Sequence, residues 1–240
     1  MVKMIIERIK TGIDGFDELI EGGFTKNSIT LLAGNSGTGK TTFCIQFLYN
    51  GIVKFNEPGV YIGLGENAER IKQSALRFGM DLEKLAEKDS LVFADIPALE
   101  ISEIKSIIDS LNPKYKRLVI DPISALSFKY NTNLDMRQTI RELVELIREK
   151  EISSSIVTTE ILENSNAISR FGEEFLVDNV VVLYYFREGA RRYRGLEIRK
   201  ARITNHSDII HLYKISSEET EKLGKSSGIY VYPREKVFKD

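Results

Sequence analysis

The chain has 240 residues, of which 42% are hydrophobic and 29% are charged, so it is long enough to bury the core of one α/β domain. Its formal net charge of −1 argues against strong non-specific binding to nucleic acid, and no apolar run approaches the length of a membrane span. The N-terminal segment carries a charge within its only apolar patch, unlike a secretory signal, and a single cysteine, Cys44, excludes a disulfide framework and a cysteine-based metal site. We therefore expect a cytoplasmic protein with no membrane partner.

The first predicted elements lead the chain into a central sheet. Residues 9–24 have the pattern of a short helix that ends at a pair of glycines, and Thr11 or Asp14 could cap its start. Residues 28–33 are predicted as a short buried strand, and residues 41–49 as the helix that follows it. The segment that joins this strand to this helix carries the strongest functional signal.

Residues 34–41 fit the phosphate-binding pattern Gly-x-x-x-x-Gly-Lys-[Ser/Thr] without a mismatch. Glycines let the backbone turn back so that its N–H groups point at phosphate oxygens, Lys40 supplies a mobile cation for the β- and γ-phosphates, and the Thr41 hydroxyl can ligate Mg²⁺. The alternative is an ordinary glycine-rich turn, but strand, loop, lysine and threonine together favour nucleotide binding. The predicted nucleotide-binding residues of this phosphate loop are Gly34, Asn35, Ser36, Gly37, Thr38, Gly39, Lys40, Thr41 and Thr42.

The middle of the chain alternates predicted strands with amphipathic helices. The strands are expected at residues 60–64, 91–95, 117–121 and 154–160, and the helices at residues 68–79, 101–111 and 135–149. This alternation predicts a mostly parallel sheet with right-handed crossovers, in which ligands gather at the carboxyl ends of the strands. The phosphate loop, Glu66, Asp121 and residues 158–160 all lie at such ends.

The last third of the chain has a different character. Residues 180–186 and 196–202 flank a turn around residues 188–189 and are predicted to form an antiparallel hairpin. Further short strands are expected at residues 211–215 and 228–232, joined by a polar, charged connection. We find no internal repeat, so we expect one domain.

Two acidic residues are candidates for the chemistry of the site. Asp121 follows an apolar strand and is placed to hold Mg²⁺, or a water on it, opposite Thr41; the alternative is an acid that caps the next turn. Glu66 is the candidate that orients and deprotonates the attacking water, because a carboxylate at a strand end near the γ-phosphate is what hydrolysis needs. The alternative is that Glu66 favours the dipole of the helix that starts near Ala68.

The order of these motifs resembles the KaiC-like branch of the RecA-type ATPases, in the single-domain form common in archaea. The matching segments are residues 11–17, 34–42, 60–66, 77–82, 118–121, 157–160, 170–178 and 196–202. The sequence Phe-Gly-Glu-Glu-Phe at residues 171–175, followed by Lys200-x-Arg202, is far more specific than the phosphate loop. The resemblance implies a RecA-like α/β core with a mostly parallel sheet, flanking helices and a C-terminal antiparallel hairpin. It implies one ATPase domain over residues 1–240, with a core at about residues 9–215 and a C-terminal tail at residues 216–240.

The resemblance also implies a mechanism with ATP and Mg²⁺ as ligands. Such ATPases hold nucleotide between neighbouring subunits of a ring, usually a hexamer, so we expect a homo-oligomer. The strand that ends with Lys200 and Arg202 would present these cations to the next subunit's phosphates, with Thr204 and His206 just beyond. From the residues alone, the alternative is a solvated basic strand edge, and for His206 a surface histidine.

Two features depart from the family pattern. The family usually carries two adjacent acids after the second strand, where this chain has Gly65 and Glu66, so hydrolysis could be very slow. One member of this family, a clock protein, carries a pair of phosphoacceptor hydroxyls that would fall near Glu174 and Phe175 of this chain. Neither residue has a hydroxyl, so we expect no autophosphorylation there. We therefore expect an ATP-binding, ATP-hydrolysing ring protein, or alternatively a nucleotide-gated scaffold with very weak hydrolysis that acts through unidentified protein partners.

A second alternative is a recombinase-like protein that binds DNA through the arginines at the tip of the predicted hairpin. These are Arg187, Arg191, Arg192 and Arg194. The other interpretation is a solvated turn balanced by nearby acids, and Tyr193 is the one aromatic residue interleaved with the arginines. Nucleic acid is therefore left open as a partner but is not favoured.

Overall fold

The computed structural model describes residues 6–65, 67–97, 99–130, 132–161, 167–217 and 227–237. The helices are α1 (Lys40–Phe55), α2 (Ala68–Leu76), α3 (Leu82–Glu87), α4 (Ile101–Ser110) and α5 (Asn133–Glu149), with short 3₁₀ turns at Asp17–Ile20, Ile123–Lys129 and Glu173–Phe175. The strands are β1 (Arg8–Ile9), β2 (Phe24–Thr25), β3 (Ser28–Gly34), β4 (Gly59–Gly63), β5 (Leu91–Asp95), β6 (Arg117–Asp121), β7 (Ser154–Glu160), β8 (Asn179–Glu188), β9 (Arg191–Ala201), β10 (His211–Ser216) and β11 (Gly228–Lys236).

A nine-stranded sheet runs through the molecule in the order β11-β10-β9-β8-β3-β7-β6-β4-β5. The strands from β8 to β5 pair in parallel, whereas β9, β10 and β11 continue the sheet in antiparallel pairs. The predicted α/β class with a mostly parallel sheet and an antiparallel hairpin is thus confirmed. No helix in the described part of the chain is both long and apolar enough to cross a membrane.

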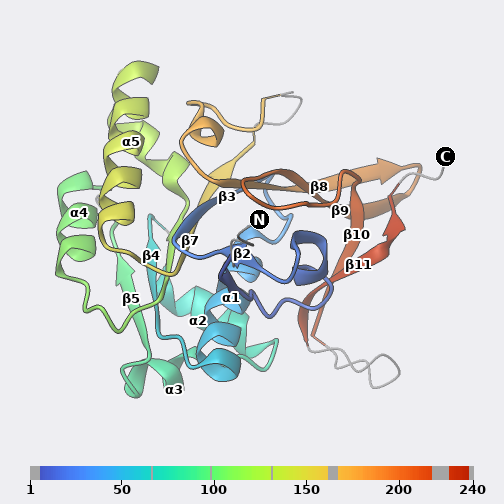
Figure 1. Cartoon of the computed structure of the whole chain (residues 1–240), viewed down its shortest axis with the longest axis horizontal. Coiled ribbons are helices and arrows are strands. Elements are labelled where there is room, and N and C mark those ends of the chain that lie inside the picture. The colour runs from blue at the N-terminus through green and yellow to red at the C-terminus, as the bar shows by residue number, and fades with distance from the viewer. Residues whose placement is uncertain are drawn as a thin grey trace, which may run out of the picture.

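The helices cover the sheet in two layers, with α4 and α5 on one face and α1, α2 and α3 on the other (Figure 1). Successive strand residues face opposite layers, so both faces of the parallel strands are apolar. Leu32 and Tyr61 pack with α1–α3, while their neighbours Leu31 and Ile62 pack beneath α4 and α5. This burial on both faces explains the continuous apolar runs that identified these strands in the sequence.

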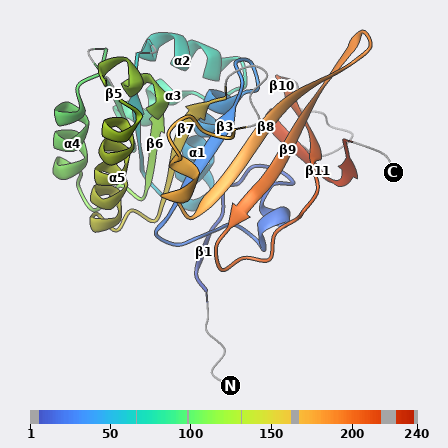
Figure 2. The ribbon, with the colours of Figure 1, turned by 90° about the horizontal axis from the view of Figure 1, so that it is seen from above.

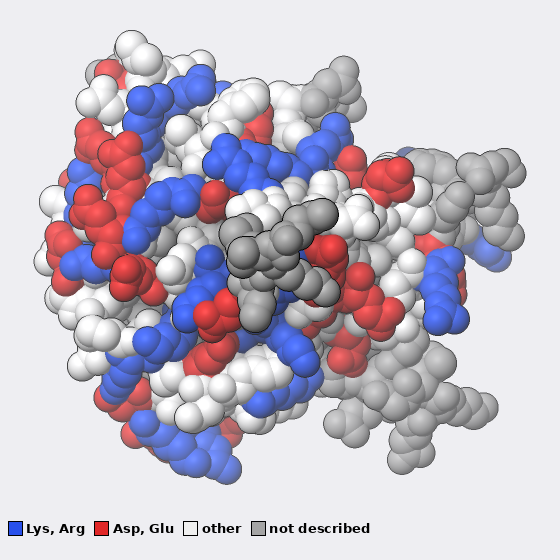
Figure 3. Space-filling view, viewed as in Figure 1, with Lys and Arg blue, Asp and Glu red and all other residues white. Residues whose placement is uncertain are grey.

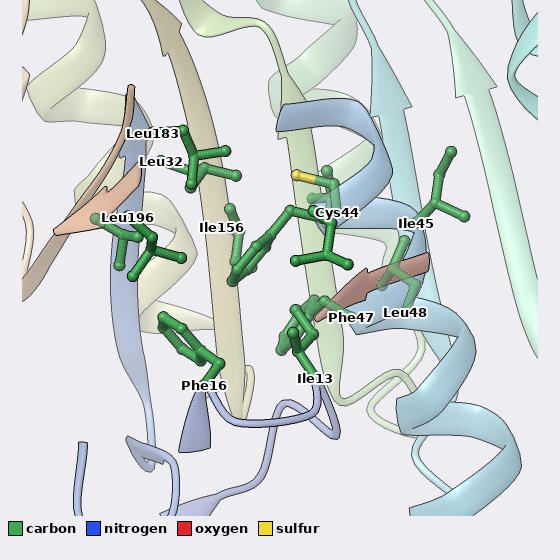
Figure 4. Packing of buried hydrophobic residues seen from close by; sticks show 14 of the residues in the cluster. Ile13, Phe16, Leu32, Cys44, Ile45, Phe47, Leu48, Ile156, Leu183 and Leu196 are labelled. Carbon is green, nitrogen blue, oxygen red and sulfur yellow. The ribbon is translucent and has the colours of Figure 1, made fainter. Parts of the chain in front are cut away.

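The N-terminal segment packs on the same face as α1. Figure 4 shows Ile13 and Phe16 of this segment pointing toward Phe47 of α1 and toward Leu32 and Leu196 of the sheet. The segment therefore contributes apolar side chains to the core that carries the phosphate loop.

The predicted helix over residues 9–24 is wrong. The Asp17 carboxylate accepts hydrogen bonds from the Thr11 N–H (2.9 Å), the Thr11 hydroxyl (2.7 Å) and the Gly12 N–H (3.0 Å), so the chain forms a loop before the 3₁₀ turn Asp17–Ile20. Burial nevertheless raises the pKa of Asp17 above its usual value. The fully buried Arg117 donates to the Lys10 carbonyl (2.6 Å) and fastens the same loop to β6.

Two edges of the sheet matter for function. We call the edge where β3, β4, β6 and β7 end the carboxyl edge, and the edge where they begin the amino edge. Gly34 pairs with Leu183 at the carboxyl edge, and Thr30 pairs with Asn179 near the amino edge. Because Asn179 also pairs with Ala201, the end of β9 lies near the amino edge. The other end of the β8–β9 hairpin projects beyond the rest of the sheet (Figure 2).

Candidate nucleotide-binding site

The phosphate loop lies at the carboxyl edge, between the end of β3 and the start of α1. Gly37 (φ +78°) and Gly39 (φ +95°) both adopt left-handed backbone conformations that favour glycine, and they turn the chain back onto α1. The loop borders a pocket of about 310 Å³ at the N-terminus of the helix, where unpaired N–H groups attract anions. The residues that line this pocket are Ser36, Gly37, Gly39, Lys40, Thr41, Thr42, Asp121, Pro122, Glu160 and Ile215.

The side chain of Lys40 is buried against the loop that precedes it. Its Nζ donates to the carbonyl oxygens of Gly34 (2.8 Å) and Asn35 (3.2 Å). Asn35 in turn accepts a hydrogen bond from the Thr38 hydroxyl (2.8 Å) and donates from its Nδ2 to the Ile161 carbonyl (3.0 Å). These contacts hold the ammonium group at the pocket wall and tie the loop to the end of β7.

Thr41 and Asp121 meet across the pocket. The Thr41 hydroxyl donates to Asp121 Oδ2 (2.8 Å), the Tyr61 hydroxyl donates to the same oxygen (2.7 Å), and the Thr158 hydroxyl donates to Oδ1. Asp121 is 2% exposed, so hydroxyl groups rather than water orient its carboxylate.

The Thr41–Asp121 pair suits Mg²⁺. A hydroxyl and a carboxylate side by side are two hard oxygen ligands, and Mg²⁺ usually takes one or two protein ligands while waters and phosphate oxygens fill the rest of its octahedron. Within the described residues, no group of three or more His, Cys, Asp or Glu side chains could hold a metal ion without further ligands. This donor set therefore fits a metal that is bound together with phosphate.

A second pocket of about 490 Å³ continues from the first between α1 and α2. Thr41 and Thr42 line both pockets, and the second is further lined by Gly65, Arg70 and Phe78, among others. The phosphate loop is thus flanked by two hollows that share Thr41 and Thr42 in their walls.

The candidate base Glu66 lies outside the described residues. Its neighbour Gly65 has φ +86° and lines the second pocket, and Asn67 caps α2 by accepting from the Glu69 N–H (2.8 Å). Another acid, Glu160 at the end of β7, lines the first pocket directly.

The basic residues at the end of β9 and directly after it are not brought to the phosphate loop of the same chain. Near the amino edge, Lys200 Nζ donates to the carbonyl oxygens of Glu174 (3.0 Å) and Val177 (2.6 Å), and burial lowers the pKa of Lys200 below its usual value. Arg202, with a side chain 56% exposed, lies 3.6 Å from the Asp178 carboxylate.

Thr204 and His206 follow β9 in the sequence, and Thr204 contacts Arg202. The Thr204 hydroxyl donates to the Arg202 carbonyl (3.2 Å) and accepts from Arg8 (3.0 Å), and His206 Nδ1 lies 2.9 Å from the Ser207 carbonyl. The structure thus groups Lys200, Arg202 and Thr204 together, but apart from the pocket.

The hairpin arginines form contacts of their own. The guanidinium groups of Arg192 and Arg194 lie over the Tyr185 ring, with centroid distances of 5.3 and 4.9 Å. These arginines lie over the exposed ring on which a nucleic-acid base would otherwise stack. Over the face in Figure 3, basic and acidic side chains are interspersed rather than gathered into one basic stripe.

Sequence reasoning missed several residues around the pocket. Ile215 of β10 lines it, and Tyr61 and Thr158 orient Asp121. The sequence does place Thr158 at the carboxyl end of a predicted strand, but it does not indicate the contact with Asp121. Nothing local to Ile215 indicates its place, because β10 reaches the loop through sheet pairing far along the chain.

Comparisons with known proteins agree with this geometry. The family model "ATPase: KaiC" matches residues 9–234. The chain is 41% identical to the circadian clock oscillator protein KaiC of Synechococcus elongatus over 216 residues, which are 84% of this chain and 41% of that protein. It is 39% identical to the circadian clock oscillator protein KaiC 1 of Synechocystis over 214 residues, again 84% of this chain and 41% of that protein.

A solved structure also matches. The crystal structure of a KaiC-like protein from the hyperthermophilic archaeon Pyrococcus horikoshii superposes with a TM-score of 0.85 at 34% identity, covering 95% of this chain and 100% of that chain. The chain spans about two fifths of the length of the curated clock proteins it matches, at 41% of each. The matched residues, the level of identity and the shared RecA-like fold together show that this chain belongs to the KaiC family of ATPases.

Proposed function

We propose that the protein binds Mg·ATP in the carboxyl-edge pocket and hydrolyses it to ADP and phosphate where two copies of the chain meet in a ring. The observation that carries this proposal is the convergence of a phosphate loop, the Lys40 ammonium and the Thr41–Asp121 pair on one pocket. Family membership supports the same activity.

Each residue of the pocket has a physical role in this proposal. Backbone N–H groups of the loop and of the first turn of α1 bind the phosphate oxygens, and Lys40 moves from its carbonyl partners to the β- and γ-phosphates. Thr41 and Asp121 would hold Mg²⁺, which supplies a positive charge that stabilises the phosphoryl oxygens during in-line attack by water. Glu66 orients and deprotonates that water, and Glu160 is the alternative base.

The second pocket is the proposed place of the nucleoside. It shares Thr41 and Thr42 with the phosphate pocket and extends away from the acids Asp121 and Glu160. The base and ribose would lie there, with the γ-phosphate pointing toward the acids. In this proposal, the first pocket holds the phosphates of ATP and the second pocket holds its nucleoside.

The positions of Lys200 and Arg202 support catalysis between copies. Lys200 and Arg202 lie near the amino edge, whereas the phosphate pocket is at the carboxyl edge of the same sheet. One chain therefore cannot bring these cations and its own phosphate pocket to the same nucleotide. A head-to-tail contact would bring one copy's amino edge to the next copy's pocket, and such contacts close into rings. Exposed apolar side chains near each edge, Ile203 (65% exposed) and Phe128 (87% exposed), are consistent with a covered surface. We propose a homohexamer, with Thr204 and His206 near the neighbour's nucleotide.

A nucleotide-gated scaffold with very slow hydrolysis is the second candidate, and Gly65 favours it. Where the family usually has an acid, this chain has a glycine with φ +86°, a conformation that an acidic residue would adopt only with strain. A missing acid beside Glu66 would slow activation of the water without weakening ATP binding.

Turnover and assembly distinguish these candidates. ATP turnover with Mg²⁺ is measured for the natural protein and for Lys40→Ala, Glu66→Gln and Glu160→Gln, while light scattering records the mass with and without ATP. We expect turnover to fall to background in Lys40→Ala and to fall strongly in Glu66→Gln. Loss in Glu160→Gln alone would assign the base to Glu160.

Two results would overturn parts of the proposal. Tight ATP binding and ATP-dependent assembly with no turnover above the Lys40→Ala background would leave the scaffold. Turnover with a monomeric mass at every ATP concentration would exclude a site built from two copies.

A further inference from the structure

The C-terminal strands β10 and β11 are fastened to the phosphate loop and to α1. The Tyr213 hydroxyl of β10 donates to the backbone carbonyl of Thr38 inside the loop. The Gln46 side chain of α1 accepts from the Ile229 N–H (2.6 Å) and donates to the Ile229 carbonyl (3.1 Å) of β11. Ile215 lies so close to Gly39 that a Cβ added there would be 2.5 Å from its Cδ1. The loop therefore rests against a part of the chain that is remote in sequence.

The contact with Thr38 has a geometric consequence. The Thr38 carbonyl and the Gly39 N–H belong to one planar trans peptide, so they point in opposite directions. A hydroxyl that holds the carbonyl toward β10 therefore turns the N–H away from β10. Gly39 lines the phosphate pocket and is the residue directly before the first helical residue, Lys40.

A glycine in this peptide makes the orientation easy to lose. Gly39 adopts φ +95°, and glycine populates positive and negative φ about equally, so rotation of the Thr38–Gly39 peptide meets little steric resistance from residue 39. An external partner is needed to select one orientation. The Tyr213 hydroxyl is such a partner, because it is the group that β10 places on the carbonyl oxygen.

The surroundings of Tyr213 keep this contact in place. Tyr213 is 2% exposed and Thr38 is fully buried, so water does not compete for the carbonyl. Burial also raises the pKa of Tyr213 far above its usual value, so the hydroxyl keeps its proton and remains a donor.

We infer that Tyr213 is a positioning residue of the phosphate site, whose hydroxyl fixes the Thr38–Gly39 peptide so that the Gly39 N–H faces the bound phosphates. This inference rests on the proposed binding of ATP phosphates in the carboxyl-edge pocket. Tyr213 acts through the loop and touches no substrate atom itself.

Removal of the hydroxyl alone tests the inference. Tyr213→Phe keeps the ring, and Tyr184→Phe is a matched control, because its hydroxyl donates to Glu197 (2.6 Å) on β9, away from the loop. Calorimetric titration with Mg·ATP, Mg·ADP and inorganic pyrophosphate gives the affinities, and thermal melting without ligand gives the stability. We expect Tyr213→Phe to weaken all three ligands about five- to tenfold, and Tyr184→Phe to change them less than about twofold.

The outcomes separate the two proposals. A merely structural Tyr213 would lower the melting midpoint and leave the three affinities unchanged well below that midpoint, and this result would overturn the inference. A crystal structure of ligand-free Tyr213→Phe with the 38–39 peptide unmoved, together with unchanged affinities, would do the same. If the natural protein bound Mg·ATP no better than Lys40→Ala, the proposed function itself would fail.

Discussion

The two edges of the sheet carry opposite halves of the proposed chemistry. At the carboxyl edge, separate strand ends and the phosphate loop surround the pocket that we propose as the Mg·ATP site. Near the amino edge, Lys200 and Arg202 contact acceptors in the short segment before β8, namely Glu174, Val177 and Asp178. The comparison teaches that the phosphate loop and its metal-binding pair are assembled within one chain, whereas Lys200 and Arg202 lie away from that pocket and would assist catalysis only on another copy's nucleotide, as we propose.

The largest expected effect is at the carboxyl edge. Lys40→Ala removes the buried ammonium of the phosphate loop, and we expect ATP turnover to fall more than about 1,000-fold, because that charge would stabilise the β- and γ-phosphates in the proposed site. Lys54→Ala is the control, since Lys54 lies on the same helix and its Nζ contacts the Gly12 carbonyl (3.2 Å) instead. Equal turnover in the two variants would show that the carboxyl-edge pocket is not the catalytic site.

The acid at the end of β6 should give the next largest effect. Asp121→Asn keeps the shape of the side chain but removes the charge that would hold Mg²⁺, so we expect turnover to fall about 100-fold. A titration with Mg²⁺ should show the half-saturating concentration raised. Asp95→Asn, at the exposed end of β5, is the matched control. A Mg²⁺ dependence like that of the natural protein would remove Asp121 from the metal site.

A smaller loss is expected from the amino edge, because Lys200 remains beside the altered residue. Arg202→Ala should lower turnover about tenfold with little change in ATP affinity, while Arg199→Ala on the preceding strand, β9, should leave turnover near normal.

Mixing variants tests whether Arg202 acts on another copy. Arg202→Ala and Lys40→Ala chains mixed in equal amounts should recover about a quarter of natural turnover, since random rings place an intact pocket beside an intact arginine at that share of interfaces. Activity of the mixture equal to the mean of the separate variants would place Arg202 in its own chain's chemistry.

The smallest expected effect concerns the pH dependence of stability. Burial, and then the neighbouring Arg202, lower the pKa of Lys200 below its ordinary value of 10.5. A cation with a lowered folded pKa opposes folding while it is protonated, so its contribution to the free energy of unfolding rises as pH increases through the lowered pKa toward 10.5.

Chemical denaturation between about pH 8 and pH 10.5 measures the contribution of Lys200 to the free energy of unfolding. Over this range, the free energy of unfolding of the natural protein should rise relative to that of Lys200→Met, by less than about 1 kcal/mol. The effect is small because the Lys200 side chain is only partly buried. Parallel curves for the two proteins would mean that Lys200 is not desolvated at the amino edge.

The central elements could be predicted because their signals are local. Apolar runs located β3, β4, β6 and β7, and helical spacing located α4 and α5. The prediction of a helix over residues 9–24 was wrong. The Asp17 carboxylate accepts hydrogen bonds from the N–H groups of the preceding loop, and these contacts stabilise a loop rather than a helix. The short helix α3 was not anticipated, since a segment of this length shows little periodicity.

For the candidate site, the sequence predicted the phosphate loop and Asp121, and the structure places Lys40, Thr41 and Asp121 around one pocket. The role of Glu66 stays a prediction, since that residue lies outside the described residues. Those predictions rest on chemistry that neighbours along the chain provide: glycines that permit a turn, a lysine beside it and an acid after an apolar strand.

Tertiary structure decided how remote residues complete and divide the site. The contact of Tyr213 with Thr38, the place of Ile215 in the pocket and the separation of Lys200 from the phosphate loop all depend on the order and direction of strands in the sheet. Backbone pairing between distant segments fixes that order, and no local pattern of residues encodes which strand ends will meet at one edge.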